Sequence, residues 1–253
     1  MPSEEREEPG LLTPPAAGNL ATAELEVVGR LAYSSNATFL VRYRSSGDSQ
    51  PEASSLAVYK PAAGERPLWD FPAESLFRRE VAAYELSRWL GWDLVPDTVA
   101  RLDGPLGPGS VQAFVDHDPE QHYFTLLEGR HRVFRRLAFF DMLVNNADRK
   151  GGHCLVDSGG RVWAIDNGLT FHPDPKLRTV IWDFAGQRLP AAERQAASRL
   201  AAALTGATEI AQALSRLLAK EEVEALRARA VRLSQPGIYP APDSSWAFPW
   251  PLV

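Results

Sequence analysis

Two aspartates, Asp148 and Asp166, each follow an apolar stretch and precede small or polar residues. Metal-assisted phosphoryl transfer needs one carboxylate to orient a nucleophilic hydroxyl and a second to hold a divalent metal ion against nucleotide phosphates. This pair is what a phosphotransfer site needs, although aspartates near turns are more often helix or turn caps, so the inference depends on the further residues below. Asp148 is followed by Arg149, so the local order is Asp-Arg, in contrast to the His-Arg-Asp order of ordinary protein kinases.

Two charged residues further upstream have the types and order that such a site requires. Lys60 ends a predicted strand over residues 55–61. A lysine there is either a solvated cap or a group that grips nucleotide phosphates. Residues 74–90 have the apolar spacing of a helix that ends at Gly91, and Glu80 lies at the edge of its apolar stripe. Glu80 is our candidate ion-pair partner for Lys60, with Glu74 as the reserve and an ordinary solvated helix face as the alternative.

The motifs Asp-Arg-x-x-x-His at 148–153 and Ala-Ile-Asp-Asn-Gly-Leu-x-Phe at 164–171 resemble the phosphatidylinositol 3/4-kinase-like group of atypical kinases. Within that group the sequence is most similar to type II phosphatidylinositol 4-kinases and to a related actinobacterial family. Tyr-Lys-Pro at 59–61 looks like the lysine motif of the type II enzymes. The resemblance covers about residues 25–190, and its most specific motifs lie within 145–171.

The resemblance implies a role for each matching residue. Asp148 would be the catalytic aspartate that accepts the proton of the attacking hydroxyl, and Asp166 the metal-binding aspartate. Lys60 would grip the nucleotide phosphates, and Glu80 would hold Lys60 in place. His153 stands where most kinases carry asparagine, so it is either a second metal ligand that suits Mn²⁺ better than Mg²⁺ or the mark of a degraded second metal site.

The nucleotide's other contacts are predicted from two segments. In the turn at 32–37, the backbone around Ser34, Ser35 and Asn36 could approach a phosphate, although without Gly-x-Gly-x-x-Gly an ordinary hairpin is the alternative. In the predicted strand 109–115, a kinase-like layout places Gln112, Phe114 and Val115 along the adenine pocket, at a hinge between two lobes.

The resemblance implies an α+β fold, namely a two-lobed protein-kinase-like architecture with a small antiparallel sheet lobe and a mainly helical lobe. We expect a disordered tail at 1–21, the N-lobe at 22–116, the C-lobe at 117–235 and a Pro/Trp-rich tail at 236–253. Residues 124–144, 190–203 and 208–233 are predicted helices. Trp246 and Trp250 are expected to pack the last segment onto the body.

Composition excludes several other classes. A net charge of −5 and a pI near 5.6 give no support for a nucleic-acid-binding surface. The single cysteine, Cys154, excludes an internal disulfide and suits the cytoplasm. His153-Cys154 lacks the Cys-x-x-Cys or His-x-x-x-His spacing of a zinc site. No stretch approaches the ~18 apolar residues of a membrane span, so a lipid acceptor would require peripheral membrane contact.

The favoured function is therefore transfer of the ATP γ-phosphate, with Mg²⁺ or Mn²⁺, to a hydroxyl of a lipid headgroup, a protein or a metabolite. Two alternatives stay open. One is a non-catalytic nucleotide-binding regulator, a pseudokinase scaffold in which His153 marks lost chemistry. The other is transfer of AMP from a reversed nucleotide.

Overall fold

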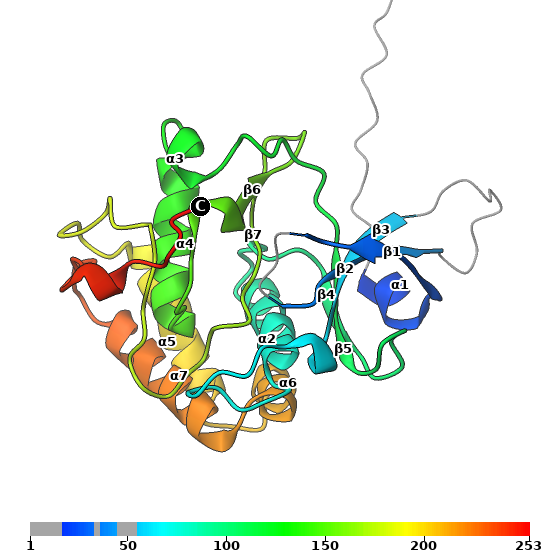
Figure 1. Ribbon diagram of the computed structural model, residues 1–253. Helices are drawn as coiled ribbons and strands as arrows, with labels where there is room; N and C mark the ends of the chain where they lie inside the picture. The colour runs from blue at the N-terminus through cyan, green and yellow to red at the C-terminus, as the bar shows by residue number, and fades with distance from the viewer. Residues whose placement is uncertain (1–16, 33–35, 45–54) are drawn as a thin grey trace, which may run out of the picture.

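The computed structural model describes residues 17–32, 36–44 and 55–253, and every structural statement below concerns these residues. The first half of the chain forms a five-stranded antiparallel sheet with the strand order β1-β2-β3-β5-β4 (Figure 1). The strands are β1 (Leu25–Arg30), β2 (Phe39–Tyr43), β3 (Ser55–Pro61), β4 (Thr98–Arg101) and β5 (Gly109–Ala113). The first half also contains the helices α1 (Ala17–Thr22) and α2 (Leu76–Trp89), and a 3-10 turn at Ala62–Gly64.

The second half is mainly helical, so the predicted α+β class is confirmed. Its helices are α3 (Tyr123–Leu126), α4 (His131–Val144), α5 (Ala191–Ala203), α6 (Glu209–Leu217) and α7 (Lys220–Ser234). A small hairpin of β6 (Cys154–Val156) and β7 (Val162–Ala164) lies between the helical segments, and 3-10 turns occur at Gly151–His153 and Ser245–Ala247.

Strand β3 shows how the sheet orients the lysine. Successive side chains of a strand point to opposite faces. Tyr59 is completely buried in a small cluster with Val41, Val111 and Leu20 of α1. Its neighbour Lys60 therefore points to the other face, where α2 packs against β4 and β5. The alternation of a single strand thus delivers the lysine to the side of the sheet that faces the helical half.

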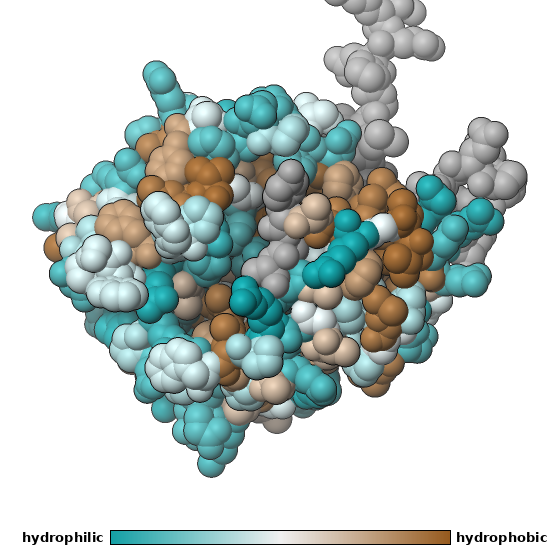
Figure 2. Space-filling model, in the orientation of Figure 1, coloured by the Kyte–Doolittle hydropathy of each residue, from teal (hydrophilic) through white to brown (hydrophobic). Residues whose placement is uncertain are grey.

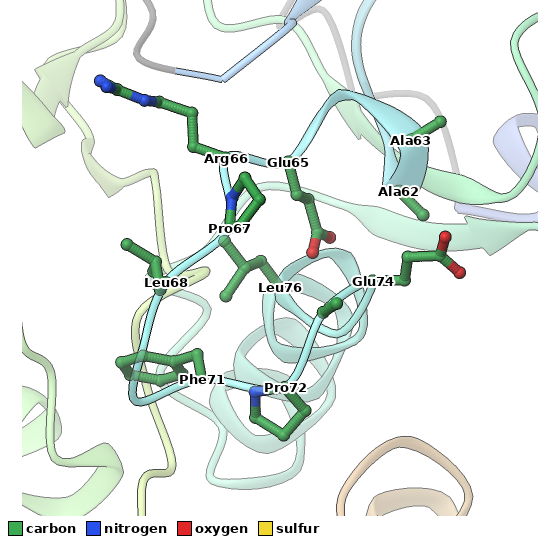
Figure 3. Close-up of a pocket in the computed structure, with 11 residues that line it drawn as sticks. Ala62, Ala63, Glu65, Arg66, Pro67, Leu68, Phe71, Pro72, Glu74 and Leu76 are labelled. Carbon is green, nitrogen blue, oxygen red and sulfur yellow. The ribbon is translucent and has the colours of Figure 1, made fainter.

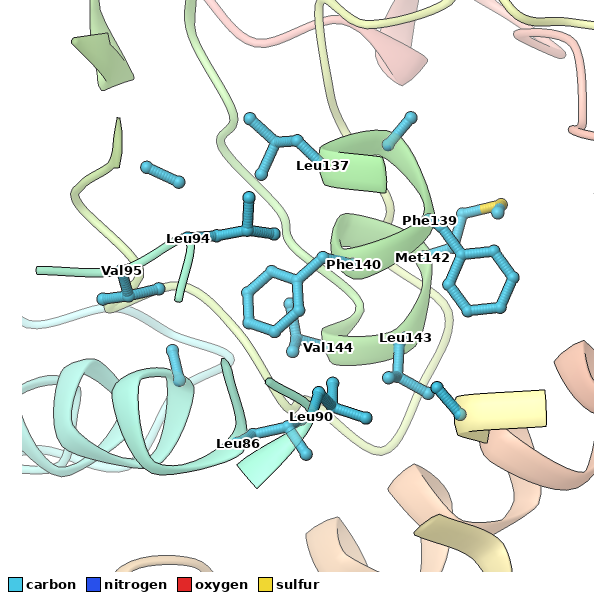
Figure 4. Packing of buried hydrophobic residues seen from close by; sticks show 14 of the residues in the cluster. Leu86, Leu90, Leu94, Val95, Leu137, Phe139, Phe140, Met142, Leu143 and Val144 are labelled. Carbon is cyan, nitrogen blue, oxygen red and sulfur yellow. The ribbon is translucent and has the colours of Figure 1, made fainter. Parts of the chain in front are cut away.

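Helix α2 packs into the core of the helical half. Its buried residues Leu86 and Leu90 belong to the same cluster as Phe140 and Val144 of α4, beside which they lie in Figure 4. The cluster that lies under the sheet is separate and contains no residue of α2. Residues 74–90 were predicted as part of the N-lobe, and this helix in fact contacts both β4 and β5 of the sheet and α6 of the helical half.

Two predicted helices are interrupted. The segment predicted as one helix over 124–144 divides into α3 and α4, because Gly129 adopts a left-handed conformation with φ of +80°. The segment 208–233 divides into α6 and α7 at Leu218 and Ala219, whose backbones are extended. At the second break the Glu222 carboxylate accepts a hydrogen bond from the Ala219 N–H and caps the new helix.

The predicted disordered tail at 1–21 extends too far, because its last residues belong to a helix. Residues 17–22 form α1, and Leu20 is completely buried under the sheet. The Leu20 and Ala23 carbonyls accept hydrogen bonds from the buried Arg101 guanidinium at 3.0 and 2.8 Å. Leu20 thus contributes to the sheet core, which explains the order of this segment. Residues 1–16 lie outside the described part of the chain.

The prediction that Trp246 and Trp250 fix the C-terminal segment is wrong, because their side chains are 76% and 86% exposed. The segment is held by Tyr239, which is 3% exposed and whose hydroxyl donates to the Arg135 carbonyl at 2.8 Å. Backbone hydrogen bonds continue the contact, including one from the Gly151 N–H to the Leu252 carbonyl at 2.7 Å. The segment therefore runs back to the turn that follows Asp148.

Within the described residues, no helix has the length and apolar character needed to cross a bilayer. Cys154 is a free, fully buried thiol at the start of β6. Burial raises its pKa to about 12, so it is protonated at neutral pH and is packed as an apolar side chain.

The large core predicts a specific stability effect. Phe140 is completely buried in it, so Phe140→Ala should lower the free energy of unfolding by about 3–5 kcal/mol through lost burial and the cavity left behind. Leu102, which is 76% exposed, is the control. Leu102→Ala should change the free energy by less than about 0.5 kcal/mol in the same urea titration. Equal effects of the two changes would contradict this description of the core.

Candidate active site

Lys60, Glu80 and Asp166 meet at the junction of the two halves. The Lys60 ammonium forms ion pairs with Glu80 Oε1 and with Asp166 Oδ1, the second at 2.8 Å. Burial alone would lower the pKa of Lys60, but the charges of Asp166 and Glu80 outweigh this effect and raise that pKa above its ordinary value. Lys60 is therefore a permanently charged group held between a carboxylate of α2 and a carboxylate that follows β7.

One oxygen of the Asp166 carboxylate is bound by Lys60, while much of the side chain is exposed. Its backbone has a positive φ of 55°, and its side chain is 48% exposed while one oxygen is held by Lys60. Burial would raise the pKa of Asp166, but the Lys60 ammonium holds that pKa well below its usual range. Asp166 is thus ionised at neutral pH and presents a second oxygen that Lys60 does not use.

His153 lies against that second oxygen. The distance from His153 Nε2 to Asp166 Oδ2 is 3.3 Å. Burial lowers the pKa of His153 to about 4, and Asp166 opposes this shift only in part, so the imidazole is neutral near pH 7. The Lys150 N–H donates weakly to Nδ1 at 3.4 Å. A metal ion on Nε2 would require the proton to move to Nδ1 and this long contact to be given up.

Asp148 faces the same space from the loop after α4. Its backbone N–H donates to Asn146 Oδ1 at 2.9 Å, and its carboxylate lies 3.4 Å from the Lys150 ammonium. Burial raises the pKa of Asp148 to about 6, a shift that Lys150 opposes and Asp166 increases. A carboxylate with this pKa can accept a proton near neutral pH.

Arg149 holds the two motifs together. Its side chain and that of Asp141 are completely buried and form an ion pair at 3.0 Å. The Arg149 guanidinium also donates to the Ile165 carbonyl and to Asn167 Oδ1, each at 2.7 Å. Asp141 thus braces the loop. Asn145 supports the segment after the second motif, because its amide donates to the His172 and Asp174 carbonyls.

These groups share one cavity of about 280 Å³. Its lining includes Asn36, Lys60, Glu80, Asp148 and Asp166, together with Gly168 and Leu169. His153 reaches it through Asp166. The Asn36 side chain accepts a hydrogen bond from the Arg66 N–H at 2.9 Å.

Five predicted nucleotide contacts are not placed in this lining. Ser34 and Ser35 lie outside the described residues. Gln112, Phe114 and Val115 are absent from the residues that line the cavity. The Gln112 amide is used internally, since it donates to Thr98 Oγ1 at 2.8 Å. The adenine-binding role of the last three residues stays a prediction.

The loop 65–72 closes one side of the cavity. Arg66 and Leu68 line both this cavity and a second one of about 190 Å³ between the loop and the start of α2 (Figure 3). The loop is tied to the helical half by a 2.8 Å ion pair between Asp70 and Lys176 and by a hydrogen-bond contact of 2.9 Å between His172 Nε2 and the Asp70 carbonyl.

The sequence analysis assigned no role to three residues at the site, Lys150, Asn167 and Arg79. Lys150 follows Asp148 by two positions, a spacing that could have drawn attention to it. Asn167 lies inside the quoted Ala-Ile-Asp-Asn motif and is completely buried, with its backbone N–H donating to Glu80 Oε2 at 2.9 Å. Arg79 carries no sequence signal for its contacts with Thr170 and Glu222, because both partners are distant in the chain.

Asp166 and His153 offer one carboxylate oxygen and one neutral imidazole as metal donors. Among the described residues, no group of three or more His, Cys, Asp or Glu side chains is placed to enclose a metal ion. Sites that complete their coordination with nucleotide phosphates and water need only one or two protein donors. The residues present fit a metal that arrives with a nucleotide.

The buried Arg149–Asp141 pair predicts a large effect of a nearly isosteric change. Asp141→Asn leaves Arg149 charged and unpaired in the interior, so the free energy of unfolding should fall by about 3–5 kcal/mol. The exposed pair between Glu26 and Arg42, 3.6 Å apart, is the control. Glu26→Gln should change the free energy of unfolding by less than about 1 kcal/mol. Denaturant titration measures both, and similar small losses would contradict the assignment.

Comparison with known proteins identifies the type of fold. Solved structures with similar folds include the Golgi casein kinase with Mn/ADP bound (TM-score 0.52, 15% identity, covering 86% of this chain and 73% of that chain). They also include hydra Fam20 with sugar (TM-score 0.53, 13% identity, covering 86% and 85%). The chain thus has a fold similar to that of these two proteins, which supports the expected kinase-like architecture. A particular closeness to phosphatidylinositol 4-kinases does not follow from these matches.

Sequence comparison shows to which family the chain belongs. No protein-family model matches the chain. Protein Rv2133c of Mycobacterium tuberculosis is 40% identical over 268 residues, which cover 92% of this chain and 93% of that protein. The chain therefore belongs to the same family as Protein Rv2133c.

Proposed function

We propose that this chain is an ATP-dependent phosphotransferase that moves the γ-phosphate of ATP to a hydroxyl group. The observation that carries the proposal is the convergence of Lys60, Glu80, Asp148 and Asp166 on one cavity. A charged lysine paired with a helix glutamate, a metal-binding carboxylate and a carboxylate base are the parts of a kinase site. The atypical-kinase fold supports the same reaction.

In this proposal Lys60 supplies the positive charge that holds the nucleotide phosphates, and Glu80 fixes its position. Asp166 and His153 would hold Mg²⁺ or Mn²⁺. The metal, when bound, supplies charge that offsets the negative charge of the phosphates. Asp166 would have to share its Oδ1 between Lys60 and the incoming ligands, while Oδ2 faces His153.

Asp148 would orient the acceptor hydroxyl and take its proton. With a pKa of about 6 it is mostly ionised at neutral pH and still basic enough to help. Lys150, 3.4 Å from its carboxylate, can offset negative charge that gathers beside the base. The hydroxyl oxygen attacks the γ-phosphorus, the bond from phosphorus to the bridging oxygen breaks, and ADP leaves.

The acceptor is a hydroxyl compound whose class the site does not specify. The motif resemblance to type II phosphatidylinositol 4-kinases supports a lipid headgroup, whereas a protein or metabolite hydroxyl suits the same chemistry. Any lipid acceptor would be reached by peripheral contact. We also propose residues 22–116 and 117–235 as the two lobes, with α2 shared between them.

Nucleotide binding is the first test. ATP with Mg²⁺ or Mn²⁺, at about 100 times its Kd, should stabilise the protein by roughly 2.7 kcal/mol, seen as a rise of several degrees in Tm. Asp166→Ala should abolish the metal-dependent part of this rise, because the metal loses its carboxylate. Asp148→Ala should keep the rise and lose turnover.

The outcomes separate the possible functions. Turnover that survives in Asp148→Ala would overturn its assignment as the base. ATP binding without transfer to any hydroxyl would favour a nucleotide-binding regulator. Mass analysis of the product distinguishes added phosphate from added AMP.

The raised pKa of Asp148 predicts a pH dependence. The base must be ionised, so kcat should fall about tenfold per pH unit below pH 6 and level off above it. ATP affinity measured over the same range should not follow this curve, because Asp166 stays ionised. A midpoint near pH 4, the ordinary value for aspartate, would show that Asp148 is not buried during turnover.

A further inference from the structure

We propose that Arg79 and Glu222 are positioning residues that hold Glu80 and the Asp166 loop in place for Lys60, an inference that rests on the proposed function. Arg79 is 2% exposed, on the turn of α2 that carries Glu80. Glu222 is 7% exposed, in the first turn of α7. The pair therefore connects the helical half directly to the ion-pair site.

The Arg79 guanidinium is bound on every side. Nη2 forms an ion pair with Glu222 Oε1, and Nε donates to the Thr170 carbonyl at 3.0 Å. Nη1 donates to the Ser75 carbonyl at 3.0 Å and to Ser75 Oγ at 2.5 Å. The Phe71 ring lies 5.1 Å away as a cation–π contact. The planar fork of arginine can satisfy these directions at once, which a lysine cannot do.

Arg79 and Glu80 form hydrogen bonds with the two ends of the short loop 167–170. Glu80 Oε2 accepts the Asn167 N–H at 2.9 Å, and Arg79 holds the Thr170 carbonyl. Thr170 Oγ1 donates to the Asn167 carbonyl at 2.7 Å and closes the turn between them. Because Asp166 immediately precedes this loop, the two α2 residues fix the metal-binding carboxylate relative to the helix that carries Glu80.

Glu222 is itself held in place. Its Oε2 accepts the Ala219 N–H at 2.9 Å where α7 begins, so the carboxylate cannot follow Arg79 if α2 moves. The pair thereby links α7, which contacts α4, α5 and α6, to α2, which itself packs against α6. If the pair is lost, the buried Arg79 charge loses its directly bound carboxylate and keeps only the weaker influence of Glu65, which favours a shift of α2 or the entry of water.

A pair that contributed only stability would behave differently, and the chain contains a suitable control. Arg136 on α4 and Glu193 on α5 form a partly buried ion pair at 3.1 Å. Neither residue lines the cavity. Glu193→Gln should reduce stability without altering the site.

The decisive experiment measures two properties of the full chain at a temperature where all variants are folded. One is the Kd for ATP with Mg²⁺. The other is the rate at which a small amine-reactive reagent labels Lys60 without nucleotide, followed by mass spectrometry. Lys60 resists labelling because its ammonium is held between the Glu80 and Asp166 carboxylates. Displacing either carboxylate frees the ammonium for the reagent, so the labelling rate increases.

Glu222→Gln should increase Lys60 labelling severalfold and weaken ATP binding, while Glu193→Gln leaves both unchanged. Arg79→Lys, which keeps a cation beside Glu222 but cannot also hold Thr170, should increase labelling as well. If Glu222→Gln does not fold, the Arg79→Lys variant tests the proposal by itself. Unchanged labelling in Arg79→Lys and in any folded Glu222→Gln protein would overturn the proposal. Labelling that rises in a protein that never transfers phosphate would support this inference and reject the kinase function.

Discussion

The Lys60 ammonium is the group on which the arrangement of the molecule depends. A cation removed from water must be paired with anions, and its two partners, Glu80 and Asp166, come from segments far apart in the sequence. The pairing is therefore satisfied only when the sheet, α2 and the loop after β7 are all in place. Two carboxylates near one ammonium also leave a net negative charge, and a bound divalent metal would compensate it.

A second buried charge pair works in parallel. Arg149 and Asp141 join the loop of Asp148 to the base of α4, and the Arg149 guanidinium reaches the Ile165 carbonyl and the Asn167 side chain. The loop after β7 is thus held on one side by the Arg149 network and on the other by α2. These networks fix the distance between the candidate base and the candidate metal ligand through buried, fully paired polar groups, which are costly to disturb.

The sequence predicted the parts of this site better than their connections. Period-two alternation located β3 and Lys60, helical spacing located α2 and Glu80, and the order of the motifs grouped Asp148, His153 and Asp166. Local pattern could not reveal the pair between Arg79 and Glu222, which lie 143 positions apart and each look like an ordinary helix charge. The tryptophans of the C-terminal segment misled the analysis for the opposite reason, because hydrophobic type alone does not determine which side chains are buried.

The buried apolar residues of α2 that belong to a core cluster belong to that of the helical half, although the helix also contacts β4 and β5. Glu80 and Asp166 belong to one continuously packed body, whereas Lys60 is carried by a sheet with its own small core. A movement of the sheet away from α2 would separate Lys60 from both carboxylates at once. Glu80 and Asp166 would then be left as two neighbouring negative charges that repel each other. The loop 65–72 is bound to the helical half by the ion pair between Asp70 and Lys176, and it would restrict that movement.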